Sequence, residues 1–336
     1  MYKNILVINT TGMGDCLWGT PALRSLKESF PQTSVHFLVN RKWISLFKGN
    51  PHIDHLHGYK HTFFHQLLLL FSLRRFFFDR ILIFHANKDI ERLLRLLNSG
   101  DVLAHQPFPW LRPGNYLEIK DKVHGIQRNL ELVKKAGARQ VSTKMEIFFE
   151  PSDLSQCEDF MQRHGLMDGE MVYLNTGGSY ISRRWPLDSF AKLIRLLRER
   201  DNFRIVLGGG PAEQEPLLRL KNSLPDSSAV VLSNGLPLKA EAALIQKCRL
   251  MVTSDTGPMH IGFAVRTPVI SIYGPTDNQT SGPYQLADQG KNILQSTEIC
   301  ADCNYVACKT PTCMEAIPPE RIMEKISALL SMKAPQ

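Results

Sequence analysis

Residues 250–276 read LMVTSDTGPMHIGFAVRTPVISIYGPT, and this stretch decides the fold. Its apolar start predicts a buried strand, the turn at Asp255 opens a short helix, and Pro268–Thr276 forms the next strand with a Gly-Pro turn. A turn that ends a strand and opens a helix presents unpaired backbone N–H groups to an anion, and the helix dipole favours negative charge there. Asp255 and His260 add side chains that can orient a sugar or ribose hydroxyl. The alternative is that Asp255 and Thr256 only cap the helix.

A second turn of this kind follows the first predicted strand, Asn4–Asn9. Residues 10–15 read TTGMGD and lead into a helical run from Cys16 to Ser29. The two glycines let the backbone approach a ligand closely, and Asp15 falls in the first helical turn, at the sheet edge where such folds bind ligands. Leu17 stands where a dinucleotide fingerprint has its third glycine, which disfavours NAD binding. A carboxylate in this loop is better suited to act as a general base than to bind a phosphate, which it would repel. Asp15 could instead be a helix cap.

Strand-like and helix-like runs alternate along the whole chain, which predicts an α/β protein with parallel sheets. With 336 residues, we expect two Rossmann-like, doubly wound domains that face each other across a cleft. The turn-rich stretch Glu150–Asp153 is interpreted as the junction, which gives an N-terminal domain 1–152 and a C-terminal domain 153–336. The expected strands are Asn4–Asn9, Ser34–Val39, His55–His57, Arg80–Phe84 and Val102–Ala104, then Met171–Asn175, Arg204–Leu207, Val230–Leu232, Leu250–Thr253 and the segment from Pro268.

Composition is that of a folded protein, with 43% hydrophobic and 21% charged residues, so disorder is not expected. The net charge is +8. No basic-aromatic ladder or zinc-finger spacing indicates a nucleic-acid partner, and a phosphorylated acceptor or an anionic membrane leaflet explains the charge more simply. The first strand begins almost at residue 1, so no export signal is expected and a cytoplasmic location follows.

The most apolar segment is 61–78, which carries no charged side chain from His61 to Leu73. These 13 residues are too few to span a bilayer. Arg74 and Arg75 follow them directly. One interpretation is a buried helix before the strand Arg80–Phe84. The other is a helix whose exposed aromatic and basic residues rest on the inner leaflet and attach the protein peripherally.

Four cysteines, Cys300, Cys303, Cys308 and Cys313, lie close together in the sequence. Four thiolates can bind a tetrahedral structural Zn²⁺, although the spacing lacks a second C-x₂-C pair. The alternative is a folded loop with mostly buried thiols. The chain contains no Asp-x-Asp sequence that would suggest a catalytic Mg²⁺.

Five motifs in chain order resemble glycosyltransferase family 9, the ADP-heptose:lipopolysaccharide heptosyltransferases and their relatives. They are GMGD at 12–15, RRWP at 183–186, GGGPAE at 208–213, DTGPMH at 255–260 and YGPT at 273–276. The resemblance implies the two-domain glycosyltransferase B fold, in which the C-terminal helix, here Pro319–Ser331, packs back toward the N-terminal domain. It also implies inverting transfer of a heptose, or a related sugar, from an ADP-sugar donor to a lipopolysaccharide core-type acceptor. We expect a monomer that needs no cofactor for catalysis.

The resemblance also implies roles for individual residues. Asp15 becomes the general base, and the acceptor-side loop around it contains Thr11, Gly12 and Gly14. Arg183 becomes the phosphate contact where relatives often carry Lys, and Arg184 beside it is the alternative for that contact. A guanidinium group keeps the charge and adds a bidentate fork for phosphate oxygens.

The remaining donor residues come from four loops of the second half. Thr256, Gly257 and the amides after them would hold the diphosphate, with Asp255 and His260 near the sugar or shaping the loop. Glu213 would accept hydrogen bonds from ribose hydroxyls, unless it is one more surface glutamate, and Leu236 would lie against adenine. Thr176 and Ser179 offer hydroxyls in the loop that precedes Arg183.

Other interpretations stay open. His124 and Arg128 open a helix at i, i+4 spacing and could contact an anionic acceptor, although a surface helix face explains them as well. The same two-domain architecture also suits a nucleotide-sugar epimerase or hydrolase. A non-catalytic protein that binds nucleotide sugars is the third possibility, but such a protein has no need of Asp15.

Overall fold

The computed structural model describes residues 2–87, 89–105, 108–112, 114–119, 122–284, 292–298, 300 and 303–331. The contacts between residues divide the chain into two compact units, Met1–Glu150 and Pro151–Gln336. The division falls two residues before the expected boundary, because Pro151 and Ser152 begin helix α6 (Pro151–His164). Proline is well suited to a first helical position, since its fixed φ is helical and its missing N–H would be unpaired there.

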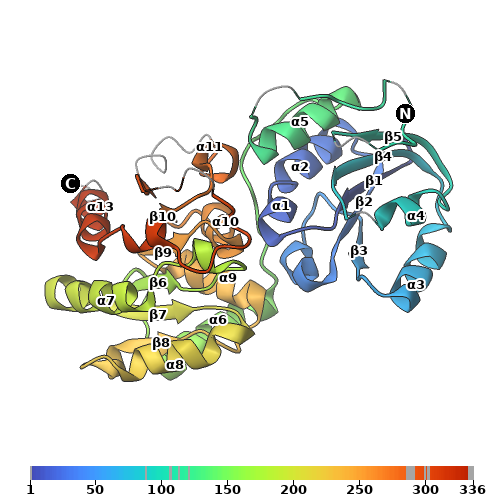
Figure 1. The fold of residues 1–336 in the computed structure, drawn as a ribbon. Helices are drawn as coiled ribbons and strands as arrows, with labels where there is room; N and C mark the ends of the chain where they lie inside the picture. The colour runs from blue at the N-terminus through green and yellow to red at the C-terminus, as the bar shows by residue number, and fades with distance from the viewer. Residues whose placement is uncertain are drawn as a thin grey trace. The chain divides into compact units, whose positions relative to one another are not determined.

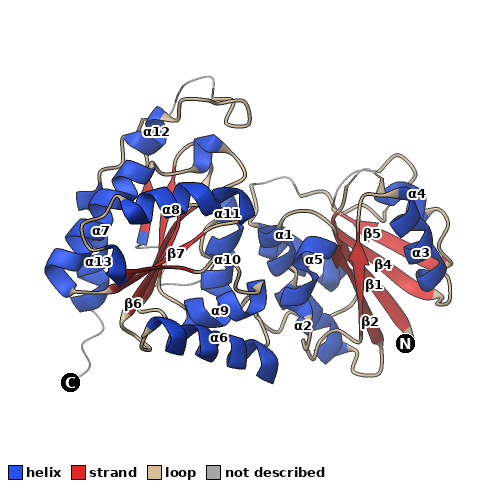
Figure 2. Cartoon of the chain, turned by 90° about the horizontal axis from the view of Figure 1, so that it is seen from below, coloured by secondary structure: helices blue, strands red, loops and turns tan. Residues whose placement is uncertain are grey.

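The first unit is a five-stranded parallel sheet with the order β3-β2-β1-β4-β5. Helices α1, α2 and α5 cover one face, and α3 and α4 lie on the other (Figure 2). The chain runs outward from β1 in one direction and then from β4 in the other, so the point where the order reverses lies between β1 and β4. Ligands of such sheets bind beyond the carboxyl ends of the strands at this reversal point.

The strands are β1 (Asn4–Asn9), β2 (Ser34–Asn40), β3 (His55–Tyr59), β4 (Phe78–His85) and β5 (Ser99–Ala104), and the helices are α1 (Met13–Leu17), α2 (Thr20–Ser29), η1 (Arg41–Phe47), α3 (Phe63–Leu73), α4 (Ile90–Leu94) and α5 (Gly125–Lys135).

The strand β1 is buried along its whole length, as a central parallel strand covered on both faces should be. It pairs with β2 from Asn4 to Asn9 and with β4 from Ile5 onward. The predicted strands of this unit are all present, and most are longer by one to three residues. The register brings the ends of β1 and β4 together, since Asn9 pairs with His85.

The helical run after the first turn is not continuous. We predict one helix from Cys16 to Ser29, but the chain forms α1 and α2 with a break at Trp18 and Gly19. Pro21 lies in the first turn of α2, where its missing N–H costs nothing. A side chain at Gly19 would press against Phe84, because its Cβ would lie 3.3 Å from that ring. The prediction was wrong because Pro21 starts a new helix here.

The second unit is a six-stranded parallel sheet with the order β11-β10-β9-β6-β7-β8 (Figure 1). Its order reverses between β6 and β9. Helices α7, α8 and α13 pack on one face, and α6, α9 and α10 on the other. The strands are β6 (Met171–Asn175), β7 (Arg204–Gly208), β8 (Val230–Leu232), β9 (Leu250–Ser254), β10 (Val269–Tyr273) and β11 (Ile293–Gln295), and the other helices are η2 (Ile181–Arg183), α7 (Leu187–Asp201), η3 (Pro211–Glu213), α8 (Gln214–Asn222), η4 (Ser227–Ala229), α9 (Leu238–Lys247), α10 (Gly257–Ala264), α11 (Asn278–Ser281), α12 (Thr312–Glu315) and α13 (Pro319–Ser331).

The C-terminal helix α13 packs against α7. Ile322 and Ile326 are fully buried and belong to the core of the second unit, together with Trp185. The Trp185 indole N–H donates to the carbonyl of Ile317, 2.9 Å away, just before the helix. The buried side chains of α13 are therefore covered by its own unit, and packing toward the first unit is not needed to bury them.

Candidate active site

Asp15 lies at the third position of α1, beyond the carboxyl end of β1. Its Oδ2 accepts hydrogen bonds from the Thr11 hydroxyl at 2.8 Å and from the Gly12 N–H at 3.1 Å. A Cβ on Gly12 would lie 3.1 Å from the same oxygen, so glycine allows this close approach. The carboxylate therefore has a fixed orientation and is half-buried at the reversal point of the first sheet.

The loop that holds Asp15 is fastened from three sides. Asn40, at the end of β2, donates to the carbonyl of Thr10 at 3.2 Å. Asn87, after β4, donates to the same carbonyl at 3.3 Å, and its N–H donates to the Thr10 hydroxyl at 3.2 Å. The Trp43 indole donates to the carbonyl of Thr11 at 3.3 Å. A loop tied to three separate elements loses little further freedom when a substrate binds.

Three basic side chains lie near one another in the first unit, and the charge of Asp15 acts on two of them, His85 and Arg128. His85 ends β4, His105 follows β5, and their rings lie 5.4 Å apart. Burial lowers the pKa of His85; the charge of Arg128 lowers it further, while that of Asp15 raises it. Burial and the charges of His85 and Arg128 lower the pKa of His105 to about 3. Both histidines are therefore neutral at pH 7, and Arg128 is the one permanent positive charge in this group.

Arg128 is half-buried on α5, so it does not belong to a simple surface face. Burial lowers the pKa of Arg128 and the charge of Asp15 raises it. Its Nε has no hydrogen-bond partner in the part of the chain that the structure describes. His124 instead caps α5, because its Nδ1 accepts from the Ile126 N–H at 3.1 Å. Of this pair, Arg128 carries the permanent charge that suits contact with an anion.

The sequence reasoning missed His85 and His105. Each comes at the end of a predicted strand, Arg80–Phe84 and Val102–Ala104, and so at the same sheet edge as Asp15. The strand-end rule that selected Asp15 would also have selected them, because carboxyl ends of parallel strands meet at one edge of a sheet.

In the second unit, Asp255 and Thr256 lie where β9 ends and α10 begins. Thr256 is the N-cap, yet its side chain makes no capping hydrogen bond. Its hydroxyl instead accepts from Asn175, at the end of β6, at 3.0 Å. Asn175 also donates to the Thr253 hydroxyl at 2.9 Å, so it ties the two strands together at the reversal point. The Thr256 side chain therefore helps to fix the start of α10 without capping its first N–H groups.

The two neighbouring arginines have separate surroundings. The Arg183 guanidinium lies over the rings of Tyr180 and Tyr305, with an Nη1 to Asp255 Oδ2 distance of 3.6 Å. Its Nε is buried and has no partner among the described residues. Arg184 is used within its own loop, because its Nε donates to the carbonyl of Gly178 at 2.8 Å. Arg183 therefore remains the better candidate for an anion.

Glu213 accepts a hydrogen bond from Arg184 at 3.1 Å. The backbone that packs against the Glu213 side chain belongs to glycines. A Cβ on Gly210 would lie 2.8 Å from Glu213 Oε2, and a Cβ on Gly209 would lie 3.0 Å from Glu213 Cβ. The glycine run thus lets this loop fold closely around one oriented carboxylate, which is a hydrogen-bond acceptor at the same sheet edge as Asp255.

The other expected donor residues differ in exposure. Thr176, after β6, is buried, and its hydroxyl has no partner among the residues described. Ser179 is exposed, whereas His260 is buried on α10. Gly257 is half-buried at the first position of α10. The structure therefore places Thr176, Gly257 and His260 at the reversal point, with Ser179 farther along an exposed loop.

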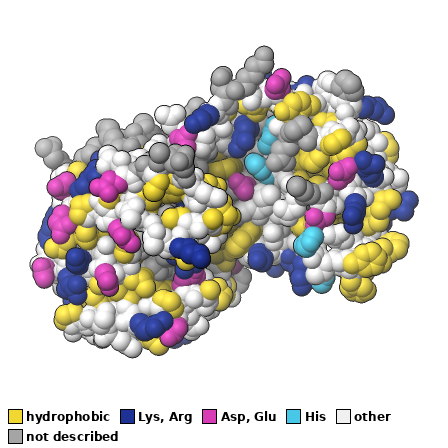
Figure 3. Space-filling view, viewed as in Figure 1, with side chains coloured by type: hydrophobic (Ala, Val, Ile, Leu, Met, Phe, Trp, Pro, Cys, Tyr) yellow, Lys and Arg dark blue, Asp and Glu magenta, His cyan; other side chains and the backbone are white. Residues whose placement is uncertain are grey.

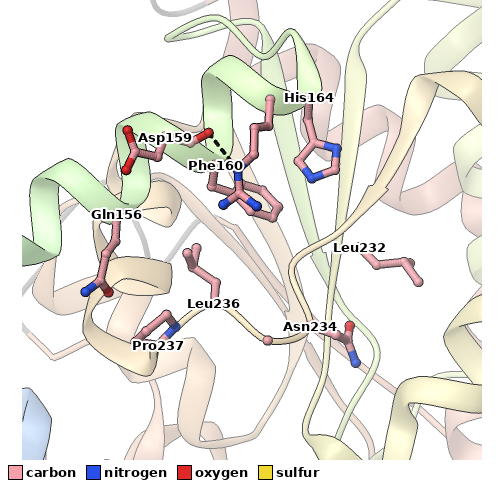
Figure 4. A pocket seen from close by; sticks show the side chains of 10 residues that line it. Gln156, Asp159, Phe160, His164, Leu232, Asn234, Leu236 and Pro237 are labelled. Carbon is pink, nitrogen blue, oxygen red and sulfur yellow. Dashed lines mark hydrogen bonds between the residues drawn. The ribbon is translucent and has the colours of Figure 1, made fainter.

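Leu236 lies in the loop between β8 and α9 and lines a cavity of about 470 Å³. Figure 4 shows the cavity between this loop and α6, which contributes Phe160 and His164. Asn234 lines the same cavity, and its Oδ1 is buried without a partner in the described part of the chain. The cavity is thus lined by apolar side chains of this loop and α6, with polar and charged ones among them.

Comparison with known proteins decides the family. Residues 109–312 match the model of glycosyltransferase family 9 (heptosyltransferase), which is more than half of the chain. The chain belongs to glycosyltransferase family 9. Lipooligosaccharide heptosyltransferase 2 of Campylobacter jejuni is 26% identical over 335 residues, which cover 95% of this chain and 96% of that protein.

Solved structures share the fold. A family 9 glycosyltransferase from Veillonella parvula superposes with a TM-score of 0.83 at 22% identity, covering 99% of this chain and 98% of that one. An Escherichia coli heptosyltransferase, solved with ADP-2-deoxy-2-fluoro heptose, superposes with a TM-score of 0.72 at 20% identity, covering 97% and 99%. The two parallel sheets of this family 9 enzyme are thus those of the glycosyltransferase B fold, as predicted.

The expected zinc site of the family 9 enzyme is not supported. Within the described residues, which include all four cysteines of the cluster, no three metal-binding side chains converge. Cys300 and Cys303 are exposed, whereas Cys313 is buried in α12, where its Sγ would lie 3.0 Å from a Cβ on Gly274. Burial raises the pKa of the Cys313 thiol and so opposes the thiolate that zinc requires. The zinc interpretation is therefore not supported, and the alternative of mostly buried thiols is wrong, because of the four only Cys313 is buried.

Proposed function

We propose that this glycosyltransferase moves a heptose, or a closely related sugar, from an ADP-sugar to a lipopolysaccharide core-type acceptor, with inversion at the anomeric carbon. One observation carries the proposal. The chain has an oriented carboxylate at the reversal point of one sheet and, at that of the other, a guanidinium group close to Asp255, which directly precedes a helix N-terminus whose N-cap side chain makes no capping bond. The first suits a base and the second a departing diphosphate.

The donor half of the proposal rests on Arg183 and the start of α10. A diphosphate would accept hydrogen bonds from the N–H groups at Gly257 and beyond, and would take the place of Asp255 as the partner of Arg183. The stacking of Arg183 on Tyr180 and Tyr305 holds its guanidinium flat, which favours a bidentate contact with phosphate. The Escherichia coli heptosyltransferase solved with ADP-2-deoxy-2-fluoro heptose supports the same donor class here.

The adenosine of the donor would lie along the loops of Glu213 and Leu236. Glu213 can accept from two ribose hydroxyls, because its two oxygens offer more lone pairs than Arg184 uses. Leu236 would pack on adenine, and the Asn234 Oδ1 would accept from the exocyclic amino group. That contact would satisfy a buried acceptor that otherwise lacks a partner among the described residues.

The proposed reaction is a single displacement. Asp15 Oδ2 is occupied by Thr11 and Gly12, so Oδ1 would accept the proton of the acceptor hydroxyl. The acceptor oxygen then bonds to the anomeric carbon as the bond from that carbon to the phosphate oxygen breaks. ADP leaves with the electron pair, and attack from the opposite face inverts the configuration. His85 and His105, as neutral imidazoles, could hydrogen-bond the acceptor beside the carboxylate.

We propose that Arg183 and the α10 N-terminus stabilise the leaving diphosphate without a metal ion. Fixed donors aimed at developing charge are commonly the largest contribution to catalysis, and they need no Mg²⁺ to act. On the acceptor side, Arg128 would contact an anionic group close to the base. This arrangement suits a phosphorylated or carboxylated core sugar.

We also propose that the enzyme is a monomer in the cytoplasm that works at the inner face of the cytoplasmic membrane, since a lipopolysaccharide precursor is lipid-anchored. Among the described residues, no helix is long and apolar enough to span a membrane. The attachment proposed is peripheral.

The test is turnover of a panel of nucleotide sugars with and without extracted core lipid. We expect ADP release from ADP-heptose only when the acceptor is present. Release without acceptor would indicate a hydrolase, and interconversion of the donor would indicate an epimerase. Donor binding by calorimetry with no turnover on any core acceptor would indicate a binding protein and would overturn the proposal.

A further inference from the structure

The helix α3 presents an apolar face to solvent. Five of its eleven side chains are large, hydrophobic and exposed, and the two most exposed, Phe63 and Phe64, have 83% and 66% of their surface accessible. The other three are Leu67, Leu68 and Phe71. At roughly 100° per residue, these positions fall within an arc of about 140° on one side of the helix. Such a continuous apolar stripe on an outer face is not explained by packing within the chain.

The opposite side of α3 fixes the helix in place. Leu69 and Leu73 are buried in the core of the first unit. The Gln66 side chain donates to the Tyr59 hydroxyl at 3.3 Å, and that hydroxyl donates to Asp89 at 2.5 Å. The helix is therefore anchored by one side, and its apolar outer side is a permanent feature of the surface.

Hydrophobic side chains also gather beside the helix. Phe77, just before β4, is 57% exposed. Figure 3 shows hydrophobic surface where Figure 1 places α3, with basic side chains near it. If a fully exposed aromatic side chain presents ~200 Å², the patch is on the order of 500 Å², which is as large as the largest patches on ordinary soluble proteins. Patches of this size commonly mark a docking surface.

The charged side chains next to α3 in the sequence are basic, and the carboxylate of Asp89, which lies near the start of the helix, is bonded to Tyr59 and His61. Arg74 and Arg75 follow the last turn of α3 and are exposed, and Lys60 precedes the helix and is exposed too. No acidic residue occurs from 61 to 78. The next carboxylate along the chain, Asp79, is bonded to the N–H groups of Lys3 and Asn4 at 2.7 and 2.9 Å. An apolar stripe edged by arginines complements a surface that is apolar inside and anionic outside.

We infer that α3 lies in the plane of an anionic bilayer. Phe63, Phe64 and Phe71 enter the boundary between headgroups and acyl chains, and Arg74 and Arg75 contact lipid phosphates. A second copy of the chain would fit less well, because it presents the same basic residues beside its own α3 and offers no anionic surface to Arg74 and Arg75. The inference deepens the proposed function and rests on it for the reason the enzyme meets a membrane, namely a lipid-anchored acceptor.

The experiment is co-sedimentation of the full chain with vesicles that contain no sugar acceptor. Wild type should bind vesicles of phosphatidylcholine with phosphatidylglycerol more tightly than vesicles of phosphatidylcholine alone. The double variant Phe63→Gln, Phe71→Gln should bind both at least about tenfold more weakly, since two anchoring rings are lost. The matched control is Met167→Gln, Leu218→Gln, which replaces exposed apolar residues of the second unit and should bind as wild type does.

A second double variant, Arg74→Gln with Arg75→Gln, tests the contribution of positive charge. This variant should lose about tenfold or more on phosphatidylglycerol vesicles and little on phosphatidylcholine alone. Its control is Lys134→Gln with Lys135→Gln, two exposed basic residues at the end of α5. If the arginine variant and the lysine control lost the same affinity for phosphatidylglycerol vesicles, the effect would reflect net charge alone. That result would overturn the role of α3.

Two further outcomes would overturn the inference. One is wild type that does not bind anionic vesicles. The other is vesicle binding that the phenylalanine variant retains. If sedimentation velocity shows a dimer that this variant abolishes, and vesicles are not bound, the face is a self-association surface instead.

Because the vesicles carry no acceptor or donor, failure here is separate from failure of the transfer reaction. On a water-soluble, deacylated acceptor, the phenylalanine variant should keep wild-type ADP release.

Discussion

Replacing Asp15 with Asn removes the proposed base while keeping the local structure. The carboxamide oxygen can still accept from the Thr11 hydroxyl and the Gly12 N–H, which are the two bonds now made by Oδ2. What is lost is the ability to take a proton from the acceptor. A positioned base contributes about 10²–10⁴-fold, so kcat should fall at least about a hundredfold, which is ~2.7 kcal/mol on the barrier.

The assay is acceptor-dependent ADP release at saturating donor, with ADP affinity measured by calorimetry. The ADP affinity should change by less than about twofold, because the proposed phosphate contacts belong to Arg183 and α10 in the other unit. The matched control is Asp188→Asn, which neutralises a first-turn carboxylate of α7 and should leave kcat unchanged. This comparison separates loss of the base from loss of a helix-end charge.

The helix-cap interpretation of Asp15 makes the opposite prediction. A cap is worth about 1 kcal/mol of stability, so the Asn variant would unfold more easily and turn over normally. A rate within about threefold of wild type would remove Asp15 as the base. A loss of rate matched by an equal loss of ADP affinity would also refute the reasoning, because it would mean that the substitution disturbs donor binding.

Arg183→Gln should weaken ADP binding by about tenfold or more in calorimetry, because a charge-assisted contact to phosphate is lost, and the same change at Arg184 should weaken it less. His36 is buried, and burial together with the charges of His55 and His57 lowers its pKa to about 3. The unfolded chain is protonated first, so His36 should contribute about 1.4 kcal/mol per pH unit to the fall in the free energy of unfolding in urea below pH 6.5, and His36→Gln should reduce the slope by about that amount. Gly208→Ala should destabilise the protein by about 2 kcal/mol or more in urea, because its Cβ would overlap the buried Tyr173 hydroxyl; an unchanged midpoint would contradict this.

The central strands could be predicted from the sequence because each is an apolar run closed by a glycine or acidic turn. Asp15 and Asp255 followed from the same reasoning, since a polar residue after a buried strand of a parallel sheet must lie at the ligand-binding edge. The short strand β11 was not predicted, because three residues are too few to show a pattern. The loops that hold Asp15 in place were also not predictable, since Asn40, Trp43 and Asn87 come from separate parts of the chain.

Two features needed three-dimensional information. The segment at α3 is apolar on all sides, so its sequence does not say which side faces the protein and leaves both burial and exposure open. The cysteine cluster failed for a related reason, because thiol direction depends on the packing of Cys313 beside Gly274. In both cases the residue types were visible, but the direction of the side chains was not.

The anchoring of Thr10 and Thr11 by Asn40, Trp43 and Asn87 has an evolutionary consequence. A loop held by several hydrogen bonds cannot easily be reshaped by one substitution. Each substitution would leave the other hydrogen bonds in place and one polar group of the loop without a partner. Descendants of such a protein would keep their chemistry while drifting in the segments without such ties. New acceptors should therefore arise through divergence at the periphery of the first unit, with the base unaltered.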